Sequence, residues 1–243
     1  MKYAVKSNIG KRVHNEDSYL LPDGYGPPFL FAVADGMGGH AAGAVASKLI
    51  VDGLSEISSS LEIDRAVEQL KNAVGRVNLQ VYESAEDDVS LRGMGSALVC
   101  ALVSGDRFVA ANVGDSRMYH FDGETLSRVT TDHSFVEQLV LQGIITEEDA
   151  RVHPQRNIIT RAVGIYPVVD VDVFERTWAA GDVLMLCSDG LHGALTEAEI
   201  AEALRSDLPL EELCDGFVQT ALDHGGTDNI TLILIRCEED DVK

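Results

Sequence analysis

Basic residues are scarce in this sequence of 243 residues. Lysine and arginine together number 19 against 40 acidic residues, which gives a formal net charge of −21. A chain this acidic repels nucleic acid and anionic lipid surfaces, so neither is expected as its main partner. An anionic substrate meets the same repulsion, and its binding would require a local positive charge such as bound cations.

Long apolar runs are absent as well. No stretch approaches the roughly 18 apolar residues that a membrane span requires, and the first residues, MKYAVKSNIGKRV, lack the apolar core of a signal peptide. The four cysteines form no C-x-x-C pair, and none is followed six residues later by the arginine that a cysteine phosphatase needs. We therefore expect reduced thiols, a cytoplasmic location and chemistry without a cysteine nucleophile.

The remaining composition is that of an ordinary globular protein, with 45% hydrophobic and 24% charged residues. Four predicted strands, FLFAVA, ALVCALV, VLMLC and ITLILI, are apolar at nearly every position. A strand with one face in water would alternate between apolar and polar residues. These strands must therefore be covered on both faces, by a second sheet or by helices.

The order of the predicted elements is that of an α+β fold rather than of alternating βαβ units. We expect one domain that spans residues 1–243. Predicted strands cover residues 29–34, 97–103, 107–113, 118–121, 168–176, 183–187 and 230–235, and predicted helices cover residues 40–57, 64–84, 134–142, 197–205 and 210–223.

A glycine-rich stretch follows the first apolar strand. Residues 36–41 read GMGGHA and fit G-x-G-x-x-A, the turn that places a dinucleotide pyrophosphate on a helix N-terminus. Asp35 stands directly before the first glycine and would repel that anion. Two helical segments follow where the dinucleotide fold needs a second strand that ends in an acid. We interpret the glycines as a tight turn that delivers the Asp35 carboxylate.

Three carboxylates stand at the ends of the most apolar strands. Asp35 and Asp189 each follow a strand and precede a glycine, and Asp228 precedes the last strand. Any one Asp-Gly pair is explained by the preference of turns for these residues. The three carboxylates converge if the last strand runs antiparallel to the other two. Carboxylate oxygens suit hard ions such as Mg²⁺ or Mn²⁺, whereas zinc favours histidine and cysteine.

Eight segments, in register along the whole chain, resemble the metal-dependent type 2C (PPM) protein serine/threonine phosphatases, especially the short bacterial members. They read RVHNED, VADGMGGHAAG, GMGSALV, NVGDSR, TTDHS, ITRAVG, LCSDGLHG and GTDNITLILI. The resemblance implies a four-layer α-β-β-α sandwich of two mainly antiparallel sheets flanked by helix pairs, with a small flap at about residues 133–157. It also implies hydrolysis of phosphoserine and phosphothreonine by water activated at a binuclear Mn²⁺ or Mg²⁺ centre.

The resemblance assigns the metal ligands by match of motif. Asp35 would bridge the two core ions and the Gly36 carbonyl would bind one of them, while Asp189 and Asp228 would complete the other. Asp115 would hold a weaker third ion together with Asp189. From the residues alone, Asp115 lies in a predicted hairpin turn at residues 110–117, where its turn preference is a sufficient explanation.

The resemblance assigns further roles around the ions. Arg12 would grip the substrate phosphate, and Glu16 and Asp17 would orient bound waters. Animal members carry a histidine directly after the Asp-Gly pair, proposed as the acid that protonates the leaving oxygen. Met37 occupies that position here and cannot donate a proton. His40 is the nearest candidate for an acid or a substrate contact; since a metal-bound water could serve instead, the acid is left unassigned.

The resemblance also implies partners. We expect phosphoprotein substrates of a cognate Ser/Thr kinase and a monomeric chain. The alternative function is that of a catalytically inactive family member that acts as a phosphoprotein-binding module. Loss of a metal carboxylate would indicate it, but Asp35, Asp189 and Asp228 are all present. The D-x-D run at residues 168–173 resembles that of aspartyl-phosphate hydrolases, but too few residues follow it for that fold.

Overall fold

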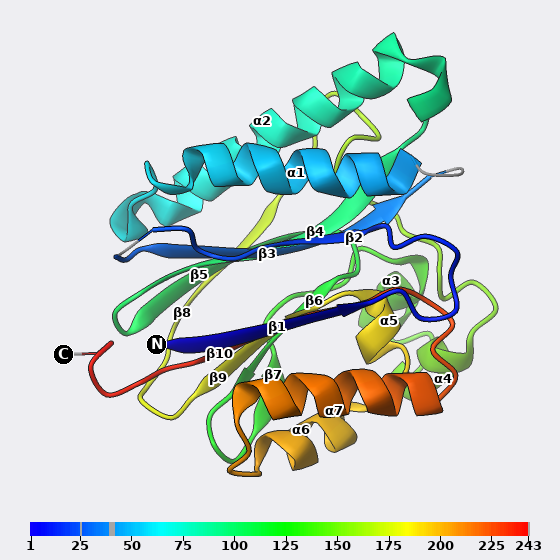
Figure 1. Ribbon diagram of the computed structural model, residues 1–243. Helices are drawn as coiled ribbons and strands as arrows, with labels where there is room; N and C mark the ends of the chain where they lie inside the picture. The colour runs from blue at the N-terminus through cyan, green and yellow to red at the C-terminus, as the bar shows by residue number, and fades with distance from the viewer. Residues whose placement is uncertain (25, 39–41, 243) are drawn as a thin grey trace.

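The computed structural model describes residues 1–24, 26–38 and 42–242. Figure 1 shows two sheets packed face to face between two pairs of helices. Each sheet has five strands, in the orders β2-β3-β4-β5-β8 and β1-β10-β9-β6-β7, and neighbouring strands run antiparallel. The α+β sandwich expected from the sequence is confirmed.

The two sheets draw their strands from both halves of the chain. The first sheet contains β2 (Asp17–Leu20), β3 (Phe29–Met37), β4 (Gly95–Ser104), β5 (Arg107–Val113) and β8 (Asp172–Thr177). The second contains β1 (Lys2–Asn8), β10 (Ile230–Arg236), β9 (Val183–Cys187), β6 (Arg117–Phe121) and β7 (Leu126–Arg128).

Helix pairs cover the outer face of each sheet (Figure 1). The first sheet is covered by α1 (Ala42–Ser58) and α2 (Ala66–Asp87), and the second by α6 (Glu197–Leu204) and α7 (Leu210–Asp223). Three shorter helices, α3 (Phe135–Leu141), α4 (Glu147–Val152) and α5 (Asp189–His192), lie together at one end of the sandwich. None of the helices in the described part of the chain is long and apolar enough to cross a membrane.

The apolar strands are covered on both faces, as their composition predicts. Successive side chains of a strand point to opposite faces of the sheet. In β4, Leu98 therefore packs into the layer under α1 and α2, while Val99 packs into the layer between the sheets. A third apolar layer fills the space between the second sheet and its helices.

The hairpin predicted at residues 110–117 is wrong, because β5 and β6 belong to different sheets. Gly114 makes the connection possible: its φ is +112°, and a Cβ atom there would lie 2.4 Å from the Cβ of Ala97. The chain turns tightly over Ala97 and crosses from the first sheet to the second. Asp115 is thereby carried to the junction of the two sheets.

Two leucines give a matched pair of substitutions that tests the layer between the sheets. Leu184 in β9 is fully buried there, whereas Leu79 on α2 is 42% exposed. We expect Leu184→Ala to lower the free energy of unfolding by about 2–5 kcal/mol, since it removes apolar contacts and leaves a cavity, and Leu79→Ala by less than about 1 kcal/mol. Urea unfolding followed by circular dichroism measures both. Equal losses would mean that this layer is not close-packed.

Candidate metal centre

Carboxylates from both sheets gather at one end of the sandwich. Asp35 lies in β3 and is paired in register with Asp17, the first residue of β2. From the second sheet, Asp189 is the first residue of α5 and follows β9 after Ser188, and Asp228 lies two residues before the start of β10. The prediction that Asp35 follows its strand is wrong, since β3 continues to Met37, which pairs with Gly95 of β4. Pairing with β2 on one side and β4 on the other, rather than a turn, therefore holds Asp35 in place.

The proton affinities of these acids show how close they lie to one another. Burial raises the pKa of Asp35 well above its ordinary value, and four neighbouring carboxylates raise it further by charge repulsion: Asp17, Asp189, Asp115 and Asp228. Burial likewise raises the pKa of Asp17 to about 7 and that of Asp189 to about 6. Like charges held together in a poorly solvated place favour a bound cation.

Several oxygens in the cluster are buried with no donor to satisfy them. Glu16 Oε1, Asp17 Oδ1 and Asp115 Oδ1 have no hydrogen-bond partner among the residues that the structure describes. A buried carboxylate oxygen without a partner carries a large desolvation cost, which a cation or its bound waters would remove. The residues present therefore fit a divalent cation with oxygen ligands.

The cluster is open rather than a closed cage. Within the described residues, no three His, Cys, Asp or Glu side chains stand close enough together to enclose an ion by themselves. Mg²⁺ usually keeps several waters and takes only one or two carboxylates from a protein. A water-rich site of this kind suits the arrangement better than a zinc site, which four protein side chains normally complete.

Glycines bring the backbone of β3 against the start of α1. A Cβ atom on Gly36 would lie 2.1 Å from the carbonyl oxygen of Gly43 and 2.6 Å from that of Glu16. The Gly36 N–H donates to the Glu16 carbonyl at 3.1 Å, and the Ser47 hydroxyl donates to the same oxygen at 2.6 Å. Glu16 is thereby fixed beside Asp35.

Asn229 ties the N-terminal loop to the Asp228 turn. Its side-chain oxygen accepts from the Glu16 N–H at 2.8 Å, and its amide nitrogen donates to the carbonyls of Ile9 and His14 at 2.9 and 3.0 Å. Its backbone N–H donates to the Asp228 carboxylate at 2.8 Å. Sequence reasoning assigned Asn229 no role, although it stands next to Asp228 in the GTDN segment.

Arg12 supplies positive charge at the edge of the cluster. Its guanidinium donates to Asp228 Oδ2 at 2.7 Å and to the Thr227 carbonyl at 3.3 Å, while about half of the side chain, 52%, is exposed. The predicted phosphate grip is therefore placed beside a predicted metal ligand. His40, the candidate acid, lies outside the residues that the structure describes.

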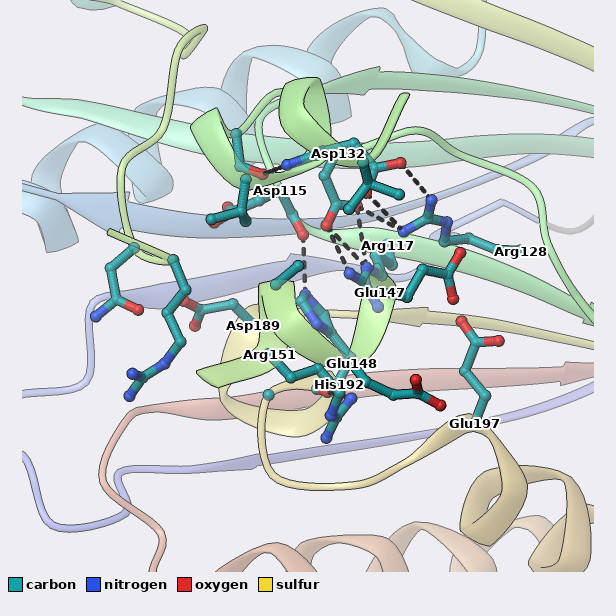
Figure 2. Close-up of a pocket in the computed structure, with 18 of the residues that line it drawn as sticks. Asp115, Arg117, Arg128, Asp132, Glu147, Glu148, Arg151, Asp189, His192 and Glu197 are labelled. Carbon is teal, nitrogen blue, oxygen red and sulfur yellow. Dashed lines mark hydrogen bonds and ion pairs between the residues drawn. The ribbon is translucent and has the colours of Figure 1, made fainter. Parts of the chain in front are cut away.

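A pocket of about 370 Å³ lies between the cluster and the helices α3 and α4 (Figure 2). Asp115 and Asp189 line it on one side, and the segment predicted as a flap, residues 133–157, forms the other. Arg151 of α4 donates to the backbone carbonyls of His192 and Leu195 at 3.3 and 3.1 Å, which joins this segment to the turns that follow α5.

His192 and a buried ion pair hold the Asp115 turn. Burial lowers the pKa of His192 to about 3, so the ring is neutral, and its Nε2–H donates to the Asp115 carbonyl at 2.9 Å. Arg117 binds Asp132 through two nitrogens, with the Nη2 to Oδ2 distance at 2.7 Å. Sequence reasoning missed His192, because its contact spans 77 residues of the chain.

Known proteins share both the sequence and the fold. The family model for protein phosphatase 2C matches residues 6–232. The serine/threonine phosphatase stp of Listeria innocua is 40% identical over 228 residues, which cover 92% of this chain and 90% of the relative.

Solved structures give the same result. The crystal structure of the serine/threonine phosphatase Stp1 from Staphylococcus aureus has a TM-score of 0.94 and 38% identity, and covers 98% of this chain and 95% of its own. The catalytic domain of the phosphatase PstP in complex with two manganese ions has a TM-score of 0.85 and 35% identity, with 96% of both chains covered. The chain therefore belongs to the protein phosphatase 2C family and is a serine/threonine protein phosphatase.

Proposed function

We propose that this chain hydrolyses phosphoserine and phosphothreonine in proteins with water activated at a binuclear Mn²⁺ or Mg²⁺ centre. The observation that carries the proposal is the convergence of carboxylates from both sheets, with buried oxygens that lack a donor. The manganese-containing PstP structure supports the same choice of ions. When bound, such ions lower the pKa of a shared water, so that it becomes a nucleophile at neutral pH.

The proposed roles follow the sequence predictions. The two core ions are assigned to Asp35, the Gly36 carbonyl, Asp189 and Asp228, and a weaker third ion to Asp115 with Asp189. Asp17 supports its role in orienting water through its own contacts: one carboxylate oxygen accepts from the Ser188 hydroxyl at 2.9 Å, and the other is buried without a donor. Glu16, with one such oxygen of its own, has the same role.

Arg12 is proposed to bind the substrate phosphate. A guanidinium presents a planar fork of donors that matches a phosphate, so it holds two of the phosphate oxygens at once. The Thr227 carbonyl fixes its Nε, and its half-exposed side chain reaches the edge of the cluster. The same positive charge offsets the repulsion between an acidic protein and an anionic substrate.

We also propose the substrates, the role of the flap segment and the oligomeric state. The substrates are phosphoproteins of a cognate Ser/Thr kinase, residues 133–157 act as a flap beside the site, and one domain spans residues 1–243. A cytoplasmic location is proposed as well. A monomer agrees with the net charge of −21, which opposes self-association and binding to nucleic acid or anionic membranes.

The metal dependence is tested by removing the ions and their ligands. EDTA should abolish hydrolysis of p-nitrophenyl phosphate and of a phosphothreonine peptide, and Mn²⁺ or Mg²⁺ should restore it. Asp35→Asn and Asp189→Asn should each lower kcat at least about a hundredfold, since even residues outside the ligand shell cost 10–100-fold. Asp87→Asn, an exposed acid at the end of α2, is the control and should keep full activity.

Two outcomes of this test would contradict the proposal. Turnover that persists in excess EDTA, or that only Zn²⁺ restores, would exclude the mechanism. Binding of the phosphothreonine peptide with no turnover under any metal condition would favour the inactive binding module instead.

Arg12→Ala separates phosphate binding from metal binding. We expect kcat/KM for the phosphothreonine peptide to fall about tenfold to a thousandfold, because a donor to the developing charge is lost. Arg12→Lys should recover part of the loss, since it keeps the charge but not the fork. Affinity for Mn²⁺, measured by calorimetry, should hold or rise, because Asp228 loses its competing partner. Weaker Mn²⁺ binding with an unchanged KM would make Arg12 a structural residue.

The site acids also predict how the metal-free protein responds to pH. An acid whose pKa is raised by folding contributes stability that is lost as the pH rises through its folded pKa. Burial raises the pKa of Asp17 to about 7 and the pKa values of Asp35 and Asp115 well above the ordinary value. Between about pH 5 and about pH 8, around the folded pKa of Asp17, the protein in EDTA should therefore lose the stability contributed by this acid as the pH rises, and Asp17→Asn should remove that loss.

Bound ions should reverse this loss. Comparison with Asp17→Asn isolates this acid, since the other titratable groups are the same in both proteins. Excess Mg²⁺ or Mn²⁺ stabilises the folded state by about 2.7 kcal/mol per site at a hundredfold excess over Kd. Thermal unfolding should show a gain of several degrees, larger at the higher pH because protonated carboxylates do not bind, and smaller in Asp35→Asn. A Tm that is insensitive to both pH and ions would contradict the metal site.

A further inference from the structure

A groove of about 650 Å³ is lined by residues of α6, α7 and the turns beside them. These two helices lie in the layer that covers the second sheet (Figure 1). Its floor is apolar and includes Leu195, Leu213 and Phe217. Leu208, in the connection between the two helices, adds an apolar side chain that is 45% exposed. None of the carboxylates of the candidate metal centre lines this groove, so catalysis does not account for it.

Gly216 lines the groove. It is exposed in the middle of α7, where a glycine costs about 1 kcal/mol relative to alanine. Packing within the described chain does not require it, because a Cβ atom there would have nothing within 4 Å. Gly53 of α1 differs: its Cβ would lie 2.7 Å from Val77 of α2, so that glycine permits helix contact. Gly216 therefore leaves open space beside the apolar floor of the groove.

The charges around the groove restrict what can enter it. Residues 196–226 contain eight acidic residues and one arginine, Arg205. That arginine is already engaged, with Glu202 at 3.3 Å and with the Glu124 carbonyl at 2.9 Å. Glu199, Glu202 and Glu212 line the groove itself. An occupant with Lys or Arg beside its apolar residues would gain attraction, whereas a second copy of this chain, at −21, would be repelled.

The position of the groove indicates the backbone conformation of the occupant. A groove with an apolar floor is the kind of surface that binds the apolar face of an amphipathic helix. A helix pairs its backbone N–H and C=O groups internally and presents an apolar stripe. We propose that the groove between α6 and α7 docks a cationic amphipathic helix of a partner protein, with apolar residues at i, i+3, i+4 and i+7 and Lys or Arg beside them.

The test selects the occupant without assuming its sequence. A library of random peptides of about four helical turns, displayed on phage, is passed over the immobilised chain and counter-selected on Gly216→Trp. Sequences retained only by the unmodified chain should be basic and show the helical apolar spacing. The leading peptide is then synthesised, and its Kd is measured by fluorescence anisotropy.

Variants locate the binding of that peptide. Gly216→Trp should weaken it at least about tenfold, as expected when the centre of an interface is blocked. Leu208→Glu is a second groove variant that leaves α7 intact, and Glu212→Lys tests the charge of the rim; both should weaken binding. Gly75→Trp is the matched control, since Gly75 of α2 also has open space beside it but lies outside the groove, and it should change nothing. Unchanged hydrolysis of p-nitrophenyl phosphate shows that each variant is folded.

Three results would overturn the proposal. The first is a selection in which no peptide distinguishes the unmodified chain from Gly216→Trp. The second is a groove-dependent peptide that is acidic or neutral, or that gains no helical circular dichroism on binding. The third is self-association of the chain that Gly216→Trp abolishes, which would make a second copy the occupant.

Discussion

Repulsion among buried carboxylates is the constraint on which the rest of this structure depends. Burial raises the pKa values of Asp17, Asp35, Asp115 and Asp189, and the charge of neighbouring carboxylates raises each of them further. Ionised carboxylates that are buried this close together would move apart or become hydrated if nothing held them in place. The fold holds them together because each is anchored in an element whose position is set by apolar packing elsewhere. Burial of the three apolar layers, which lie outside the cluster, thus stabilises the fold against the repulsion among these carboxylates.

The anchoring relies on backbone contacts more than on side chains. Three glycines bring two segments of the chain closer than any other residue allows. Gly36 lies against Gly43, and Gly114 lies over Ala97. At Gly190, a Cβ atom would lie 1.9 Å from the Asn229 carbonyl oxygen. Asn229 and His192 add hydrogen bonds between segments that are distant in sequence. The two sheets therefore meet at the site through contacts that tolerate little displacement, which suits a centre whose proposed ligands come from both sheets.

The sequence predicted the strands that are buried on both faces, but not the edge strands β1 and β2 or the crossover between the two sheets. Strands β3, β4, β9 and β10 were found because burial on two faces produces a continuous apolar run. The exposed edge strand β1 and the four-residue β2 gave no such pattern and were missed. The Asp115 turn was taken for a hairpin because a crossover between sheets uses the same turn residues as a hairpin.

The same limit applies to the candidate site. Its acids were named because the resemblance carries them, whereas residue spacing alone indicated only Asp35, Asp189 and Asp228. Asn229 and His192 escaped notice because their partners lie between 77 and 220 residues away. Hydrophobic periodicity along the sequence carries no information about contacts between residues so far apart, so only the folded structure reveals them.

The ion pair between Arg12 and Asp228 has a consequence for the order of events at the site. In the structure, the guanidinium is the counter-charge of the Asp228 carboxylate. With the proposed roles, a cation bound at Asp228 would release Arg12, and a phosphate bound at Arg12 would free Asp228. The affinities for cation and for phosphate would then be linked, and by thermodynamic reciprocity each ligand would strengthen the binding of the other by the same factor.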